Sequence, residues 1–336
     1  MSLTDSPVTK SGLADPSKGI LVTGGSGYLG GRLCLALAEA GYQILIPTRR
    51  DPLPSWMESP GLQPIRFDQF DPLALAEPMV WVDTVIHLAA VNEVVAGKDP
   101  DAALNMAGPI QRKLLDLAID ANVKRFLKLS SAHVYGAPLV GRFDEDDACT
   151  PTHPYGIQHL LGERLVARAG EKSEMATLSV RLSNAFGAPA DTGVDRWTLV
   201  VNDLCAQAVE QKALYLRSDG RQERDFLPLG EALAGLRHLL TLDHGTWRDL
   251  GVVNLASGLS TAVIDMAKRV QRVASGLLGN DIPLSIGKGG GATGQVEISL
   301  DRLKSTGWQP WGPDDSVWDR EIEDCLRLLM QGASKG

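Results

Sequence analysis

The sequence of 336 residues predicts an α/β fold in which a doubly wound parallel sheet is followed by a smaller C-terminal lobe. From residue 19 to about residue 129, short apolar runs alternate with helix-like stretches, which is typical of βαβ units. Spaced glycines directly follow the first apolar run. After about residue 180 the pattern changes, and Gly, Pro and short strand-like segments surround two helix-like stretches.

The first part of the chain carries the signals for the sheet. Helices are expected over 32–40, where Gly41 ends the apolar pattern, and over 106–121. Because crossovers between parallel strands are right-handed, the repeated units predict a doubly wound sheet. Strands are expected where apolar residues run together, at 20–24, 42–47, 62–68, 84–90 and 124–131.

The chain is expected to divide into a flexible tail at 1–18, a sheet domain at 19–180 and a lobe at 181–330 with some segments returning to the sheet. In the lobe, LRSDGRQERDFLPL predicts a hairpin that turns at Asp219-Gly220. The other expected elements of the lobe are helices at 199–211 and 231–242 and a mobile loop at 277–298 containing GKGGGATG.

The composition excludes several classes of protein. A formal net charge of −8 and a pI near 5.3 argue against a nucleic-acid-binding surface. No apolar run approaches the roughly 20 residues that cross a bilayer, and residues 1–18 lack the apolar core of a secretory signal, so a cytoplasmic protein without a membrane partner is expected. Four widely separated cysteines match no metal-site spacing and predict reduced thiols and no bound metal: Cys34, Cys149, Cys205 and Cys325.

The glycine run ILVTGGSGYLGGRL lies between an expected strand and an expected helix. Gly24, Gly27 and Gly30 have the spacing that permits a tight turn, close approach of backbone amides to a pyrophosphate, and close helix packing. The helix N-terminus adds partial positive charge for the phosphates. The run therefore predicts a Rossmann dinucleotide-binding domain, with a plain glycine-rich turn as the alternative.

The end of the second expected strand, ILIPTRRD, bears on the choice of cofactor. An acidic residue there accepts hydrogen bonds from the adenosine ribose of NAD, whereas arginine suits the 2′-phosphate of NADP. This position holds Thr48, Arg49 and Arg50, and the first acidic residue comes only after them, at Asp51. NADP is therefore favoured over NAD, and two ordinary surface arginines are the alternative.

Six motifs in order carry a resemblance that covers about residues 19–330: TGGSGYLG, VIHLAA, LSSAHVYG, PYGIQH, VRLSNAFG and DGRQERDF. The chain resembles the extended short-chain dehydrogenase/reductases, specifically the nucleotide-sugar epimerase/dehydratase group. The resemblance implies a Rossmann sheet with a smaller C-terminal substrate-binding lobe. It also implies cofactor contacts from Tyr28 and Leu29 at the pyrophosphate, Asp68 at the adenine, Leu88, Ala89 and Ala90 along the cofactor, and Asn105 and Ser183.

The same resemblance implies an acid–base site made by Ser131 and Tyr155, with His159 where the family has a lysine. A tyrosine needs a nearby cation or hydrogen bond to ionise near neutral pH. Three alternatives remain open. Protonated His159 supports Tyr155 and activity falls with rising pH; neutral His159 binds the ribose while oxidised nicotinamide supports Tyr155; or the redox site has lapsed.

The substrate side of the site is implied by Asn184 and Arg224, which match positions that hold a nucleotide-sugar diphosphate, with core polarity or a salt bridge as the alternative. Sugar dehydratases of the family have two acidic residues after the Ser/Thr, and here these are Ala132 and His133. Dehydration is therefore disfavoured, and His133 is either a substrate contact or a structural histidine.

Together these features predict an NAD(P)-dependent oxidoreductase that acts on a nucleotide-activated sugar as a ketoreductase or an epimerase. Arg49 tilts the choice slightly toward the reductase, because free NADPH is a consumed reductant. The rival hypothesis is an NADP-binding sensor or partner protein whose redox site has lapsed. A homodimer is expected from the habit of the family.

Overall fold

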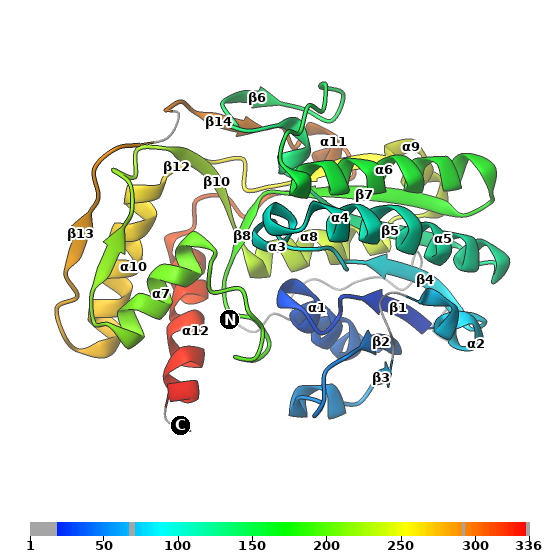
Figure 1. Cartoon of the computed structure of the whole chain (residues 1–336), viewed down its shortest axis with the longest axis horizontal. Coiled ribbons are helices and arrows are strands. Elements are labelled where there is room, and N and C mark those ends of the chain that lie inside the picture. Colours follow the sequence, from blue (N-terminus) through cyan, green and yellow to red (C-terminus); the bar gives the residue numbers. More distant parts are fainter. Residues whose placement is uncertain (1–18, 67–70, 291–292, 334–336) are drawn as a thin grey trace.

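The central feature is a seven-stranded parallel sheet with the order β11-β7-β5-β4-β1-β2-β3 (Figure 1). The computed structural model describes residues 19–66, 71–290 and 293–333. The strand order reverses between β1 and β4, which confirms the predicted doubly wound fold. The strands are β1 Gly19–Thr23, β2 Ile44–Thr48, β3 Leu62–Arg66, β4 Val82–His87, β5 Arg125–Ser131, β7 Ala176–Leu182 and β11 Val252–Leu255.

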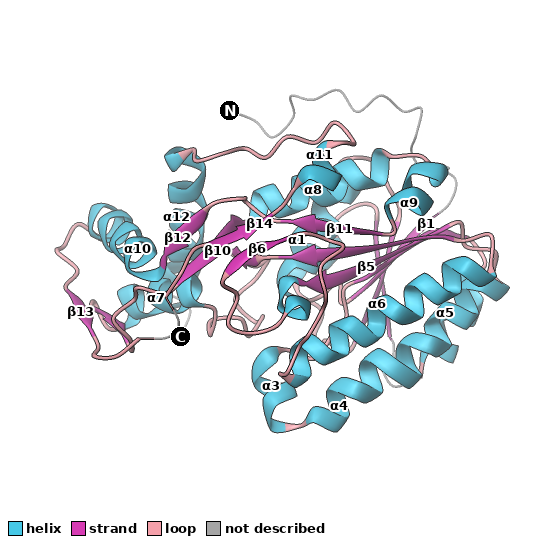
Figure 2. Ribbon diagram, turned by 90° about the horizontal axis from the view of Figure 1, so that it is seen from above, coloured by secondary structure: helices cyan, strands magenta, loops and turns pink. Residues whose placement is uncertain are grey.

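Helices cover both faces of this sheet (Figure 2). On one face, α1 (Tyr28–Glu39) and α8 (Leu229–Thr241) bury leucines against the inner strands. On the other face, α5 (Gln111–Asp120) buries leucines and α6 (Pro154–Lys172) buries Val166 and Ala169. Shorter helices connect the layers: α2 Ala76–Met79, α3 Glu93–Lys98, α4 Pro100–Asn105, α9 His244–Leu250, α11 Asp301–Lys304, the 3₁₀ turns Ser55–Glu58, Pro72–Leu75 and Ala132–Tyr135, and a π-helical turn Met106–Ile110.

A second apolar core forms among the C-terminal elements, at the left of Figure 1. Helices α7 (Val200–Glu210), α10 (Val263–Leu278) and α12 (Asp315–Ala333) pack together beside a small sheet. That sheet has the order β12-β10-β8, with β12 Ser260–Ala262, β10 Glu223–Pro228 and β8 Asn184–Phe186. Strand β11 returns from this part of the chain to the main sheet.

Two expectations for the lobe were wrong. The segment around Asp219-Gly220 is not a hairpin, because β9 (Leu214–Leu216) pairs with the parallel strand β13 (Leu284–Ile286) and β10 pairs with β8 and β12. The Asp219 amide donates to the Gly289 carbonyl at 2.7 Å, which directs the chain toward that segment. Residues 277–298 likewise contain β13 and β14 (Val296–Ile298), and β14 pairs with β6 (Gly141–Phe143), so apart from 291–292, which lie outside the described residues, they are not a structureless loop.

The helix expected over 106–121 begins earlier, at Pro100, and contains the π-helical turn. Asp99 explains the earlier start, since its carboxylate accepts a hydrogen bond from the Ala102 amide at 3.0 Å and Pro100 occupies the first helical position. The tail at 1–18 and Asp68 lie outside the described residues. None of the helices in the described ranges combines the length and hydropathy that a bilayer-spanning segment needs.

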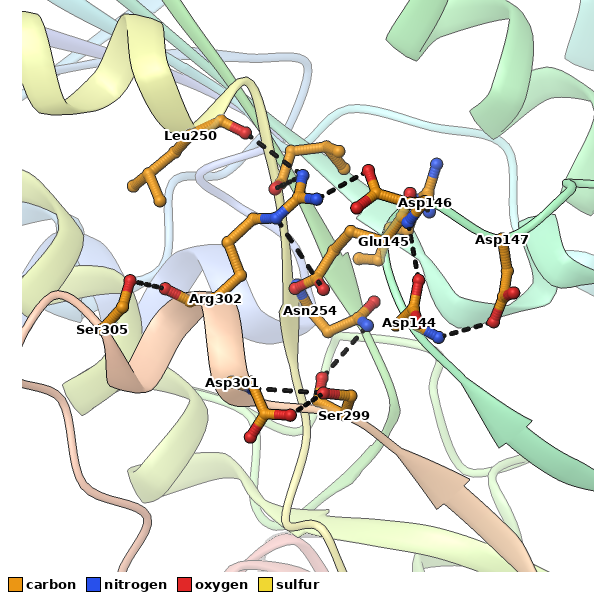
Figure 3. Close-up of polar contacts among 12 residues, drawn as sticks. Asp144, Glu145, Asp146, Asp147, Leu250, Asn254, Ser299, Asp301, Arg302 and Ser305 are labelled. Carbon is orange, nitrogen blue, oxygen red and sulfur yellow. Dashed lines mark hydrogen bonds and ion pairs between the residues drawn. The ribbon is translucent and has the colours of Figure 1, made fainter.

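Arg302 ties the segment that precedes α6 to the main sheet (Figure 3). Its guanidinium donates to Asp146 at 2.7 Å and to the Val252 carbonyl at 3.2 Å. The Glu145 carboxylate accepts a hydrogen bond from the Asn254 amide at 2.7 Å. These contacts hold the acidic run 144–147 against β11.

Candidate active site

The glycine loop joins β1 to α1 with very close backbone contacts. Gly24 has φ +72°, a conformation that glycine adopts without strain. A side chain at position 30 would place its Cβ 2.2 Å from the Gly24 carbonyl oxygen, and one at position 24 would lie 2.8 Å from the Ala89 amide nitrogen. The loop therefore brings the first turn of α1 to the carboxyl edge of the sheet, as a dinucleotide cradle requires.

A cavity of about 470 Å³ opens at this edge. Its lining fits a nucleotide because it combines the glycine loop with hydroxyl and guanidinium groups: Thr23, Gly24, Ser26, Pro47, Thr48, Arg49, Arg50 and Ala89. Leu88 and Ala89 are half-buried and Ala90 is exposed. Leu29 is buried in the core, and the Tyr28 hydroxyl donates to the Gly187 carbonyl at 3.0 Å. Tyr28 and Leu29 can therefore face the cavity only through their backbone amides.

The two arginines at the end of β2 have different surroundings. Arg50 makes a bidentate ion pair with Asp191 at 2.7 and 2.8 Å, and the hydrogen bonds with Asp191 raise the Arg50 pKa. The Trp56 indole donates to the same carboxylate at 2.7 Å. Arg49 is exposed, lines the cavity and has no ion pair within the described ranges. Asp191 thus pairs with Arg50, and Arg49 stays available to a ligand in the cavity.

Ser131 and Tyr155 come together where β5 ends and α6 begins. The Ser131 hydroxyl accepts a hydrogen bond from the His133 amide at 3.3 Å and caps the turn that follows β5. A side chain at Gly156 would place its Cβ 2.6 Å from the His133 carbonyl oxygen, so glycine lets α6 approach this turn. Burial raises the pKa of Tyr155, while hydrogen bonding with Ser131 lowers it. The structure therefore brings Ser131 close to Tyr155 at the carboxyl edge of the sheet.

His159 is an uncharged neighbour of Tyr155. Its ring lies edge-on to the Tyr155 ring with centroids 4.6 Å apart, and only 3% of the residue is exposed. Neither ring nitrogen has a hydrogen-bond partner among the residues that the structure describes. Burial, followed by the charge of Lys128, lowers the pKa of His159 well below its usual value. Of the three alternatives above, these surroundings favour a neutral His159.

Lys128 is a site residue that sequence reasoning missed. It lies on β5 opposite His87 of β4 and is 2% exposed. Its Nζ donates to the Leu129 carbonyl at 3.3 Å, and a side chain at Gly162 would place its Cβ 2.3 Å from Lys128 Cε. Burial lowers the pKa of Lys128 to about 8. A charged residue inside the apolar run KRFLKLSS was the available signal.

Arg196 and Glu93 were also missed. The Arg196 guanidinium donates to the Glu93 carboxylate at 2.9 Å. Besides burial, which dominates, the charges of Arg196 and Glu93 act on the pKa of Tyr155 in opposite directions. The two residues are 103 positions apart in the sequence, so no local sequence pattern could predict the pair.

The residues expected to hold a diphosphate are in contrasting environments. Asn184 donates to the Asp225 carbonyl at 2.9 Å, and the Ser183 hydroxyl donates to the buried Asp225 carboxylate at 2.6 Å. These side chains therefore bind Asp225. Arg224 is half-buried and, within the described part of the chain, makes no salt bridge. Burial lowers the pKa of His133, and the charge of Arg224 lowers it further. Arg224 and His133 therefore lie near one another.

Asn105 is exposed at the end of α4. All four cysteines are free thiols. No group of three or more potential metal ligands is found in the described ranges.

Comparison with known proteins identifies the family. The family model for the NAD dependent epimerase/dehydratase family matches residues 20–251. The chain belongs to the NAD-dependent epimerase/dehydratase family. This membership confirms the predicted resemblance and the oxidoreductase/epimerase class, and it makes a nicotinamide dinucleotide the cofactor.

Alignments with two relatives span most of both chains. Low-salt glycan biosynthesis protein Agl12 of Haloferax volcanii is 25% identical over 323 residues, which span 93% of this chain and 98% of that protein. A UDP-glucose 4-epimerase of Lactobacillus helveticus is 25% identical over 313 residues, spanning 87% and 92%.

Solved structures with the same fold agree with this assignment. Epimerase Mth375 from Methanothermobacter thermautotrophicus aligns with a TM-score of 0.80 at 25% identity and covers 95% of this chain and 94% of its own. MoeE5 in complex with UDP-glucuronic acid and NAD aligns with a TM-score of 0.76 at 25% identity, covering 92% and 99%.

Proposed function

We propose that this protein oxidises and re-reduces a ring hydroxyl of a nucleotide-activated sugar, with Tyr155 as the acid–base group. The observation that carries the proposal is that Ser131 interacts with Tyr155 at the same carboxyl edge of the sheet as the glycine loop. The bound dinucleotide supplies the hydride acceptor and donor. In the oxidation, the Tyr155 phenolate takes the proton of the sugar O–H, Ser131 hydrogen-bonds the same sugar oxygen, and the hydride of the adjacent C–H bond would pass to the dinucleotide. Neutral His159 would be the residue that contacts the cofactor ribose.

Epimerisation is the outcome that the relatives favour, because one is named as a UDP-glucose 4-epimerase and a solved neighbour holds a UDP-sugar with NAD. Ketoreduction is the second candidate, and it is favoured by Arg49, which lines the cavity without an ion pair among the described residues. We assign the diphosphate of the sugar nucleotide to Arg224, whose guanidinium is half-buried without an ion pair in the described part of the chain.

Mass spectrometry of the nucleotide that copurifies with the protein, followed by incubation with UDP-linked sugars, tests this function. An epimerase forms the epimer with no net change in reduced cofactor. A ketoreductase instead consumes reduced cofactor in proportion to a keto-sugar substrate. Bound cofactor without conversion of any nucleotide sugar would support the sensor hypothesis instead.

We also propose a preference for NADP, carried by Arg49. Arg49→Gln is expected to weaken NADPH binding about tenfold or more and to leave NADH binding nearly unchanged, since one charge-assisted contact to the 2′-phosphate is lost. Dissociation constants from cofactor fluorescence measure both effects. Arg66→Gln, at an exposed arginine that pairs with Asp51, is the matched control and should change neither. Equal NADPH and NADH affinities in the unsubstituted protein would refute the preference.

We further propose a cytoplasmic homodimer. Exposed apolar side chains gather on three helices of the α6 side of the molecule: Val94 and Val95 of α3, Leu104 of α4 and Ile157 of α6. Such a surface is typical of an interface between subunits. Sedimentation velocity should show a dimer, and Ile157→Glu should shift it toward the monomer. Exposed Tyr215→Glu, on β9, is the control that should leave the dimer intact.

A further inference from the structure

Helix α6 provides no permanent positive charge beside Tyr155. His159 takes the place of the lysine, is buried, and has no hydrogen-bond partner among the described residues at either ring nitrogen. A buried imidazole without an acidic partner releases its proton because the charged form loses its hydration. Any permanent positive charge that the protein itself supplies to Tyr155, beside that of an oxidised nicotinamide, therefore has to come from another element.

Arg196 approaches Tyr155 from the loop between β8 and α7. Its guanidinium pairs with Glu93 at 2.9 Å, and its side chain is 21% exposed. Glu93 begins α3, whose start is fixed to α6 by Gln158: this side chain accepts from the Val91 amide at 3.2 Å and donates to the Val91 carbonyl at 2.5 Å. Because Gln158 follows Tyr155 by three residues, the Arg196–Glu93 pair is held at the turn of α6 that carries Tyr155.

The titratable groups that face Tyr155 come from four elements. They are His133 after β5, His159 of α6, Glu93 of α3 and Arg196 of the loop. Burial lowers the pKa of both histidines. The charge of Lys128 lowers the pKa of His159 further, and the charge of Arg224 lowers that of His133 further. Arg196 is the only arginine or lysine among these described groups, and a guanidinium is a permanent cation in proteins.

We infer that Arg196 supplies the permanent positive charge that favours the Tyr155 phenolate, and that Glu93 holds this arginine and partly offsets its charge. The inference rests on the proposed acid–base role of Tyr155. The positive charge beside Tyr155 then comes from a loop and not from helix α6, so the ionisation of Tyr155 depends on where residues 187–199 lie. Glu93 and Arg196 are therefore positioning residues that set the pH range of the reaction.

The pH dependence of sugar oxidation tests the inference, because the rate rises with pH as Tyr155 ionises. Arg196→Gln should move this rise to higher pH by about one unit, and lower the rate near neutral pH about tenfold. Glu93→Gln should move the rise in the opposite direction, since the opposing carboxylate is gone. His159→Gln should leave the pH at which the rate rises unchanged. A merely structural role for the ion pair predicts the same direction for Arg196→Gln and Glu93→Gln.

Two further variants sharpen the result. Arg196→Lys keeps the charge and should return most of the rate that Arg196→Gln loses. Adding His159→Lys to Arg196→Gln places a cation on α6 and should bring the rise back to its original pH. The inference is overturned if Arg196→Gln leaves the rise in place, or if His159→Gln moves it as far as Arg196→Gln does.

NMR titration of labelled tyrosine Cζ nuclei measures the same ionisation without turnover, so failure of the proposed function is distinguished from failure of this inference. The chain has five tyrosines, and the Tyr155 signal is identified by its loss in Tyr155→Phe. Arg196→Gln should raise the pKa of Tyr155 and Glu93→Gln should lower it. Unchanged Tyr155 titration in both variants would overturn the inference even if the enzyme is active.

Discussion

Tyr155→Phe is expected to lower the rate of sugar oxidation about a thousandfold while the dinucleotide binds as before. The substitution removes the hydroxyl that takes the substrate proton, and general acid–base groups contribute about 10² to 10⁴ in rate. The phenylalanine ring keeps the edge-on contacts with His133 and His159, so the packing of α6 is retained. Single-turnover rates and cofactor titration give the two measurements separately.

Tyr215→Phe is the matched control for this substitution. Tyr215 is 53% exposed on β9, and its loss of a hydroxyl should change neither rate nor binding. Wild-type turnover in Tyr155→Phe would remove Tyr155 from the reaction. If neither the unsubstituted protein nor the variant converts any nucleotide sugar while both bind cofactor, the sensor hypothesis accounts for the site.

The parts of the fold that sequence reasoning predicted depend on local signals. The glycine loop needs only a strand, spaced glycines and a helix, and the structure shows the close contact between positions 24 and 30 that the spacing implies. The central strands are continuous apolar runs because both faces of the sheet are covered. Helix starts were less accurate, since Asp99 and Pro100 begin a helix before its apolar pattern does.

The parts that were missed depend on distant residues. Asp191 lies 141 positions from Arg50, yet it decides which arginine at β2 remains open for a phosphate. The Asp-Gly pair at 219–220 is compatible with a hairpin, but tertiary pairing places β13 against β9 instead. A local turn preference of a few tenths of a kcal/mol to about 1 kcal/mol is easily overridden by the burial of adjacent strands.

Lys128→Met is expected to stabilise the protein near neutral pH by about 3 kcal/mol. The folded pKa of Lys128 is about 8, against an ordinary value of 10.5, because burial disfavours the ammonium. Near neutral pH the folded state therefore keeps a charge that the unfolded state hydrates freely. Methionine has a similar unbranched stem and fills the space beside Gly162 without that charge.

The pH dependence of this effect has a definite sign. As pH rises through about 8, folded Lys128 releases its proton, whereas the unfolded chain keeps it until about pH 10.5. The unfolded state then binds more protons, so the free energy of unfolding of the unsubstituted protein rises across this interval. The stability difference between Lys128→Met and the unsubstituted protein should shrink over the same interval. Chemical denaturation at constant ionic strength, repeated across this pH range, measures both.

Lys113→Met separates burial from the loss of a lysine. Lys113 is exposed on α5, and its substitution should change stability by no more than about 0.5 kcal/mol at any pH. A constant stability difference for Lys128→Met from neutral to alkaline pH would contradict the depressed pKa. Since the Lys128 charge lowers the pKa of His159, Lys128→Met should also raise that pKa, which NMR of the imidazole detects. A stabilised variant with altered His159 titration would show that the charge of Lys128 costs stability and adds to burial in keeping His159 neutral.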